Sequence, residues 1–221
     1  MRREFTFRFC PVLWPEVGSL ICIVHNWPKG QKESGIQAAQ TDVAVLAGGG
    51  IDSSLCIHLL SQRGNKVRPL HIDYGQPAAL HEWQAVQRIA EHFLVVPEQI
   101  SIKAPLPICL GEVPGRNAAL IFLALMHLRS SERLICIGIH AGTPFYDCSQ
   151  QFFAVVERLV AEQTDSRVRL VAPLLDLHKP EIVTLARANA IPLDATYSCQ
   201  IGSLDPCGEC WSCKDRKALG C

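Results

Sequence analysis

Residues 43–54 read Val-Ala-Val-Leu-Ala-Gly-Gly-Gly-Ile-Asp-Ser-Ser, and this stretch decides the fold. The apolar run at 43–47 is typical of a strand that is buried on both faces. The glycines at 48–50 let the backbone turn sharply and approach a ligand without Cβ atoms in the way. Residues 52–62 then show helical spacing of their leucines. The stretch therefore predicts a strand, a tight loop and the start of a helix.

The loop has the chemistry of an anion site. Backbone amides at a helix N-terminus favour a bound anion, and Ser53 and Ser54 add hydroxyl groups. Asp52 can cap the helix or help to hold Mg²⁺. No Gly-Lys-Ser/Thr follows and the G-x-G-x-x-G spacing is absent, which excludes a Walker loop and a dinucleotide fingerprint. A plain glycine-rich turn with an Asp/Ser cap remains the alternative, and the loop alone does not decide between the two.

The same alternation of strand and helix continues along the chain. Alternating β and α elements predict an α/β fold, a twisted parallel sheet with helices on both faces. We place this nucleotide-binding domain at residues 41–195. Its further strands are expected at 66–73, 100–102, 134–139 and 168–172, and its further helices at 78–93, 117–128, 150–162 and 179–189.

Residues 1–40 have a different pattern. Polar and apolar residues alternate at 4–9, a second apolar run occupies 19–24, and a polar linker covers 29–40. Alternation with a period of two is typical of a half-buried strand. We interpret residues 1–40 as an added hairpin or arm.

Bulk composition narrows the class of protein. A chain of 221 residues with 48% hydrophobic residues can bury one good core. It has no run of about 18 apolar residues, so we expect no membrane span. Lysine and arginine number 21, as do aspartate and glutamate, and this balance argues against direct nucleic-acid binding. No secretory signal is visible, and we expect a reducing, cytoplasmic setting.

The last segment, residues 196–221, carries a cysteine cluster. Cys199, Cys207, Cys210 and Cys213 have the spacing C-x7-C-x2-C-x2-C. Four soft thiolates suit tetrahedral Zn²⁺, and a shell filled by four sulfurs leaves no position for water. We therefore predict a structural zinc site in a small C-terminal segment. Disulfides fit poorly with the odd total of 11 cysteines, and a redox pair is the minor alternative.

The glycine loop resembles a known signature. Residues 48–53 are similar to the Ser-Gly-Gly-x-Asp-Ser motif of the PP-loop ATP pyrophosphatases, whose fold is adenine nucleotide alpha hydrolase-like and Rossmann-like. The resemblance implies that the loop binds ATP and that the substrate is adenylated with release of pyrophosphate. This chain has Gly48 where the family has its first serine, so one hydroxyl contact to a phosphate is missing.

Five further motifs, in order, resemble one PP-loop branch, the QueC family of 7-cyano-7-deazaguanine synthases. The resemblance covers residues 42–220, and several ordered motifs are far more specific than one. The motifs are Asp-Tyr-Gly-Gln at 73–76 with Glu82, Val-Pro-Gly-Arg-Asn at 113–117, Tyr-Asp-Cys at 146–148 with Phe152, Lys-Pro-Glu-Ile at 179–182 after Pro173, and the cysteine tail with Arg216.

The resemblance assigns roles to particular residues. It implies catalytic roles for Asp52, Ser53, Arg116 and Lys179, and substrate contacts from Glu82, Tyr146 and Asp147. It implies that ATP and Mg²⁺ are held by Ala47, Gly48, Gly49, Gly50, Ile51, Asp52, Ser53, Ser54, Tyr74, Gln76, Arg116 and Asn117. Arg116 is a planar five-donor cation suited to phosphate or carboxylate. Each of four residues also has a purely structural alternative. Arg116 could be a turn arginine, Lys179 a solvated lysine, Asp147 a loop aspartate and Glu82 a surface glutamate.

The resemblance also implies an activity. The usual member of the family converts 7-carboxy-7-deazaguanine and ammonia to 7-cyano-7-deazaguanine, using ATP and an adenylated carboxylate. Members often form homodimers. The stretch 93–113 looks short for the family, and 138–144 looks more like divergent QueC-like proteins found beside bacterial antiviral systems. Two alternatives therefore stay open: a ligase that joins a deazaguanine carboxylate to another amine, such as a protein amine, and a catalytically impaired, zinc-containing binding subunit.

Overall fold

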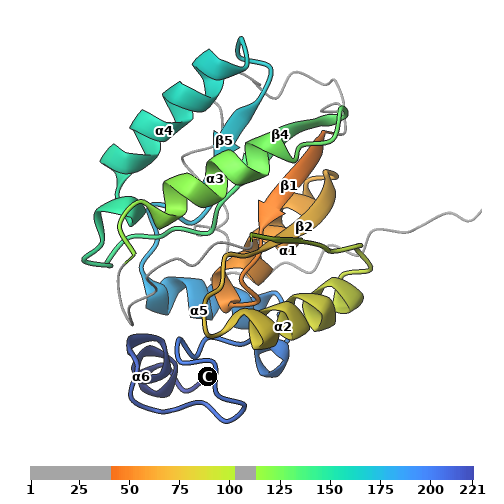
Figure 1. Ribbon diagram of the computed structural model, residues 1–221. Helices are drawn as coiled ribbons and strands as arrows, with labels where there is room; N and C mark the ends of the chain where they lie inside the picture. The colour runs from red at the N-terminus through yellow and green to blue at the C-terminus, as the bar shows by residue number, and fades with distance from the viewer. Residues whose placement is uncertain (1–40, 103–112) are drawn as a thin grey trace, which may run out of the picture.

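The computed structural model describes residues 41–102 and 113–221. The hairpin or arm expected at 1–40 lies outside the described residues, as do residues 103–112 of the stretch expected to be short. Within the described parts the chain alternates strands and helices and ends in a cysteine-containing segment (Figure 1).

The sheet has five parallel strands in the order β3-β2-β1-β4-β5. The central strand β1 is buried because it has a neighbour on each side and helices on both faces. Val45 of β1 lies in register with Pro69 of β2 and with Cys136 of β4. The strands are β1 (Asp42–Leu46), β2 (Lys66–Asp73), β3 (Glu98–Ser101), β4 (Glu132–Cys136) and β5 (Arg169–Val171).

Helices cover both faces of the sheet, as the alternating pattern predicts (Figure 1). Side chains alternate along β1, so Val43 and Val45 join one apolar core and Leu46 joins the other. The first core packs against α1, α2 and α5, and the second against α3 and α4. These helices are α1 (Ile51–Gln62), α2 (Ala79–His92), α3 (Arg116–Met126), α4 (Gln150–Gln163) and α5 (Lys179–Ala188).

The predicted α/β sheet is confirmed, with shifts at some element ends. The strand predicted at 134–139 ends at Cys136, and the chain then turns toward the start of α1. Gly138 allows this approach, because a Cβ there would lie 3.3 Å from the backbone carbon of Asp52. The third strand begins at Glu98, two residues before its predicted start.

The C-terminal segment contains one helix that the pattern did not predict. Helix α6 (Trp211–Ala218) starts directly after Cys210 and carries Cys213. Two short 3-10 turns, η1 (Tyr146–Cys148) and η2 (Leu193–Ala195), complete the elements of the described residues.

The C-terminal segment packs against the domain that precedes it. The backbone amide of Tyr197 donates to the carbonyl of Gly49 at 2.9 Å, which joins the segment to the glycine loop. Gly202 lies against the Pro77 carbonyl, where an added Cβ would meet the oxygen at 2.1 Å. The Arg187 guanidinium on α5 donates to the carbonyls of Leu219 and Gly220, each at 2.9 Å. Helix α6 therefore lies beside α5, near the glycine end of the sheet (Figure 1).

Among residues 41–102 and 113–221, no helix is long and apolar enough to cross a membrane.

Candidate functional site

A cavity of about 380 Å³ opens at the carboxyl edge of the sheet. From β1 the chain builds β2 and β3 on one side of the sheet. It then crosses back and adds β4 and β5 on the other side of β1, so the strand order reverses there. Ligands of open α/β sheets bind in the crevice at such a switch point. The loops after β1, β2 and β4, the first residues of α3 and α5, and the C-terminal segment line the cavity.

The glycine loop lines the cavity and leads into the N-terminus of α1. Gly50 caps α1 without a side-chain hydrogen bond, which leaves the first-turn amides for an anion. The hydroxyls of Ser53 and Ser54 both donate to the Gly50 carbonyl, at 3.1 and 2.8 Å. The serine hydrogens are thus used inside the loop, and the backbone amides are the donors that face a ligand. The residues of this loop that line the cavity are Ala47, Gly48, Gly50, Ile51, Asp52 and Ser53.

The three glycines of the loop differ in their surroundings. Gly49 has a φ of +70°, and a Cβ there would lie 2.7 Å from both the Ala85 Cβ and the Glu82 carbonyl oxygen. Only glycine suits that position. Gly48 is exposed, and nothing lies within 4 Å of a Cβ placed on it. The backbone at position 48 therefore accepts the serine of the related signature.

Asp52 and Lys179 form an ion pair at one end of the cavity. The Lys179 Nζ lies 2.6 and 2.7 Å from the two Asp52 carboxylate oxygens. Asp52 stands in the first turn of α1 and Lys179 in the first turn of α5, so two helix N-termini meet there. The His140 Nε2 lies 4.0 Å from the same carboxylate. Asp52 does not cap α1 through its side chain, and each of its oxygens keeps a lone pair beyond the Lys179 contact.

Arg116 and Asn117 start α3 on the opposite wall. Asn117 is held by the loop after β4: its backbone amide donates to the Asp147 carboxylate at 3.4 Å, and its side-chain amide to the Asp147 carbonyl at 3.0 Å. The Arg116 Nε lies 3.4 Å from the Asn117 Oδ1. Arg116 and Asn117 line the cavity, whereas Asp147 is buried behind them and Tyr146 is 63% exposed outside the lining.

The loop after β2 supplies a polar corner. The Gln76 side chain accepts from the Tyr74 amide at 2.9 Å and donates to the Glu82 carboxylate at 2.7 Å. Burial raises the pKa of Glu82, although the Gln76 hydrogen bond acts against it. Burial also raises the pKa of Tyr74, against the opposing charge of Arg116. All three residues line the cavity, so this corner has donors and acceptors suited to a heterocycle edge.

Two lining residues outside the predicted set carry polar atoms without a hydrogen-bond partner among the described residues. The His71 Nδ1 donates to the Ala47 carbonyl at 2.9 Å, which leaves Nε2 unpaired beside the stacked Trp83 ring. The Thr143 hydroxyl makes no hydrogen bond of normal geometry. It lies near the Cys148 thiol, whose pKa burial raises and this hydroxyl lowers. The one visible signal was His71 itself, a histidine between Leu70 and Ile72 in β2.

The C-terminal segment supplies a wall of the cavity that no pattern in the sequence predicted. Its side chains reach the cavity from both sides of the cysteine cluster, while the four cysteines themselves do not line it. Arg216 is held by the Leu193 carbonyl at 2.9 Å and the Thr196 hydroxyl at 2.8 Å. The segment's lining residues are Tyr197, Ser198, Gln200, Trp211, Ser212, Asp215, Arg216, Leu219 and Cys221.

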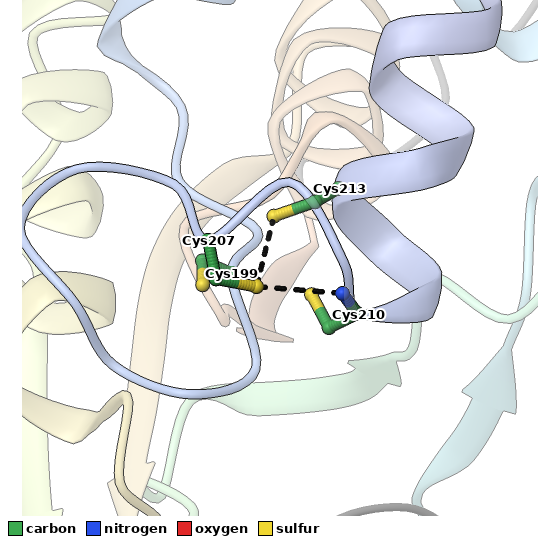
Figure 2. A group of neighbouring side chains, drawn as sticks. All are labelled: Cys199, Cys207, Cys210 and Cys213. Atoms are coloured by element: carbon green, nitrogen blue, oxygen red, sulfur yellow. Dashed lines mark hydrogen bonds between the residues drawn. The ribbon is translucent and has the colours of Figure 1, made fainter.

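The four cysteines that were predicted as metal ligands lie together (Figure 2). Their sulfur atoms all fall within 4.8 Å of one another, and Cys207 Sγ lies 3.9 Å from Cys213 Sγ. A tetrahedral ion with Zn–S bonds of about 2.3 Å separates its sulfurs by about 3.8 Å. The residues present therefore fit a metal ion.

The pKa values of the cluster's thiols also indicate that a cation is needed to hold four thiolates together. Burial acts to raise the pKa of Cys199, but hydrogen bonds from Ser203 and from backbone amides lower it to about 5. Burial and the neighbouring thiols raise the pKa of Cys213 to about 12. Four thiolates can share so small a volume only around a cation, because metal binding requires the deprotonated ligands.

Fold and site together define the class of protein as an α/β protein with a five-stranded parallel sheet, a cavity at its glycine loop and a cysteine cluster that could bind a metal. The fold is similar to that of the U34-tRNA thiolase NcsA from Methanococcus maripaludis, whose structure contains a 4Fe-4S cluster. The TM-score is 0.54 and the identity 14%, over 83% of this chain and 65% of the thiolase chain. At that identity the likeness concerns the fold alone.

Sequence comparison identifies the family. The sequence model of the queuosine biosynthesis protein QueC matches residues 42–108 and 104–219, so the chain belongs to the QueC family. The 7-cyano-7-deazaguanine synthase of Prochlorococcus marinus subsp. pastoris is 32% identical over 78% of this chain and 90% of its own length. The synthase of Aquifex aeolicus is 29% identical, over 79% of this chain and 94% of its own. The predicted family membership is confirmed.

Proposed function

We propose that the protein converts 7-carboxy-7-deazaguanine, ammonia and ATP to 7-cyano-7-deazaguanine through an adenylated carboxylate. The observation that carries the proposal is the convergence on one cavity of an open helix N-terminus, a lysine, an arginine and a buried polar corner. The first three suit a nucleoside triphosphate, and the fourth suits a deazapurine. This chain aligns with 90% and 94% of the length of two relatives that bear the synthase name, which supports the same chemistry.

The glycine loop and the two cations would hold the triphosphate. First-turn amides of α1 would donate hydrogen bonds to phosphate oxygens, since the helix dipole favours an anion there. Lys179 is placed by Asp52 to neutralise charge that develops on the transferred phosphoryl group. Arg116 enters from the opposite wall, where a guanidinium can bind a phosphate or a carboxylate with two parallel hydrogen bonds. Mg²⁺, when bound with ATP, would neutralise part of the negative charge of the triphosphate together with these groups.

The deazapurine would occupy the side of the cavity near Gln76 and Glu82. The partly buried carboxyl group of Glu82, whose pKa is raised, can donate or accept a hydrogen bond, and it lies next to the Gln76 carboxamide, which can do the same. Asp147 does not line the cavity, so we assign it the role of holding Asn117 instead of a direct substrate contact. Tyr146, on the exposed surface, contributes no contact in this arrangement.

Two activations account for the conversion. A carboxylate oxygen attacks the α-phosphorus of ATP, and pyrophosphate leaves. Ammonia then attacks the carbonyl carbon, AMP leaves with its oxygen, and an amide remains. A second ATP adenylates the amide oxygen, and loss of AMP and two protons from the nitrogen side gives the nitrile. AMP departs readily, so no nucleophilic side chain is required at the cavity.

We assign the cysteine cluster to Zn²⁺ with a structural role. Cys199, Cys207, Cys210 and Cys213 would hold the ion, and a shell of four sulfurs leaves no position for a reactant. The ion would contribute no step to the reaction. It would hold Ser198 and Trp211 against the cavity and keep Tyr197 on the glycine loop.

The direct test is incubation of the purified protein with 7-carboxy-7-deazaguanine, Mg-ATP and ammonium, followed by mass spectrometry of AMP and product. We expect two AMP per nitrile, and no AMP when the deazapurine is left out. AMP formation with coupling only when a protein amine is supplied would identify the amine ligase. No AMP under either condition would overturn the proposal and favour a binding subunit.

A further inference from the structure

His140 has no role in the ATP and deazapurine contacts proposed above, yet three features of its position single it out. It lies after β4, at the switch point of the sheet, and it lines the cavity. Its side chain is 12% exposed, so it is largely enclosed but reachable from the cavity. It stands beside the Asp52 carboxylate, which is the point where the two helix N-termini meet.

The hydrogen bond at one ring nitrogen defines the role of the other. His140 Nδ1 lies 2.7 Å from the Ala141 carbonyl oxygen, which can only accept, so Nδ1 carries the hydrogen and donates it. In the neutral ring the lone pair is then on Nε2. Nε2 points toward Asp52, with its nearest carboxylate oxygen at 4.0 Å. An imidazolium formed at Nε2 would therefore lie next to a negative charge.

The proposed reaction needs a group that takes a proton. We propose that His140 is a catalytic residue, the base that accepts a proton from the attacking amine; this rests on the proposed function. The amine lone pair forms the C–N bond at the carbonyl carbon of the adenylate. The bond from that carbon to the AMP oxygen breaks, and its electron pair leaves with AMP. The proton lost by the nitrogen goes to His140 Nε2, and from there to solvent.

Five other titratable side chains of the lining are less suited to that step, namely Asp52, Lys179, Glu82, Cys148 and His71. Both Asp52 oxygens are held by Lys179, whose ammonium has no lone pair while it is so paired. The Glu82 carboxylate accepts from Gln76 at the far, deazapurine side. Burial raises the pKa of the Cys148 thiol, which makes the thiolate scarce. His71 is 1% exposed, and its unpaired nitrogen is closed off from solvent.

The test separates the two half-reactions. His140→Gln and, as a second substitution, His140→Asn are compared with the wild type and with His127→Gln, an exposed histidine outside the lining. Exchange of labelled pyrophosphate into ATP, dependent on 7-carboxy-7-deazaguanine, measures adenylation alone. Amide formation from ammonium measures both steps. Hydroxylamine traps an adenylate as the hydroxamate with little help from a base.

Loss of a general base costs on the order of 100-fold in the step that it serves. We expect His140→Gln to keep pyrophosphate exchange and hydroxamate formation within about threefold of wild type, while ammonium-dependent amide formation falls about 100-fold. Retained exchange also shows that the variant is folded and binds ATP. An equal loss of exchange and amide formation in both His140 variants, or no loss in either, overturns the assignment. Absence of exchange in the wild type would instead overturn the proposed function itself.

Discussion

The ammonium of Lys179 lies 2.6 and 2.7 Å from the two carboxylate oxygens of Asp52, although 127 positions separate the residues in the chain. Each residue occupies the first turn of a helix, and the two helices pack on the same face of the sheet. The positive ends of both helix dipoles therefore converge with a lysine on one point of the cavity. This arrangement concentrates positive potential where a triphosphate would bind.

Lys179→Met should lower AMP formation by roughly 100-fold, because a cation that stabilises developing phosphoryl charge is lost. The melting temperature should change by little, since both side chains of the pair are partly exposed and such pairs contribute little to stability. Steady-state AMP release and a thermal melt measure the two quantities. Lys66→Met, at the exposed start of β2, is the matched control and should retain activity. Equal rates in the two variants would contradict the role of Lys179.

Gly48→Ser should increase kcat/KM for ATP by roughly 5- to 10-fold, because one more hydroxyl can hydrogen-bond to a charged phosphate. The surroundings of Gly48 are open, so the added side chain meets no clash. Gly48→Ala adds the Cβ without the hydroxyl and serves as the control. If alanine improves kcat/KM as much as serine, the gain comes from stiffer backbone and not from a phosphate contact.

Gly49→Ala should destabilise the protein by at least about 2 kcal/mol, since it combines left-handed strain with a backbone clash. The added Cβ would meet the Glu82 carbonyl oxygen at 2.7 Å. Gly64→Ala separates the two effects, because Gly64 has a φ of +79° but open surroundings. Urea unfolding should show a clearly smaller loss for Gly64→Ala. Similar losses would mean that strain alone, and not the contact with α2, fixes glycine at position 49.

The purified protein should contain about one zinc per chain, bound by the four cysteines. Cys210→Ser should lower the metal content, reduce the melting temperature by at least about 5 °C and weaken ATP binding, because the segment forms a wall of the cavity. Elemental analysis, thermal melts and nucleotide titration measure these effects. Cys221→Ser should keep its metal. Iron with visible absorption bands, in place of zinc, would overturn the assignment of the ion.

Glu132→Gln should reduce the free energy of unfolding at pH 7 by about 3 kcal/mol, because it leaves the buried Arg68 guanidinium with only its longer contact, at 3.2 Å, to the half-exposed Glu98. Arg68 donates to both Glu132 oxygens at 2.7 Å, and both residues are less than 5% exposed. Burial alone would raise the pKa of Glu132, but Arg68 and the Arg129 amide lower it. Its stabilising effect is therefore complete above the unfolded carboxyl pKa of about 4.3 and is lost as the pH falls through the lower folded value.

The difference between wild type and Glu132→Gln should accordingly shrink as the pH drops below about 4. Urea titrations between neutral and acid pH measure it. Glu157→Gln breaks the more exposed pair with Arg169 and should cost less than about 1 kcal/mol. A difference for Glu132→Gln that does not change with pH would show that packing, and not charge, is what the substitution removes.

Local patterns in the chain were sufficient for much of the fold. The apolar run at 43–47 and its glycines predicted β1 and the start of α1, because a strand buried on both faces needs such a run. The four cysteines predicted a cluster, since two overlapping C-x2-C pairs turn back on themselves. Helix α6 was missed because it is short and polar, and packing against α5 and the domain holds it in place.

Motifs of residues close together in the chain were sufficient to predict the family, the alternating α/β order and the cysteine cluster. Which side chains share the cavity follows only from the folded arrangement. It brought Lys179 and His140 to Asp52, placed Asp147 behind Asn117 and turned the C-terminal segment into a wall. These contacts join segments that only the register of the sheet and the packing of its helices bring together. No local periodicity encodes such distances, and so the site could be read only from the folded chain.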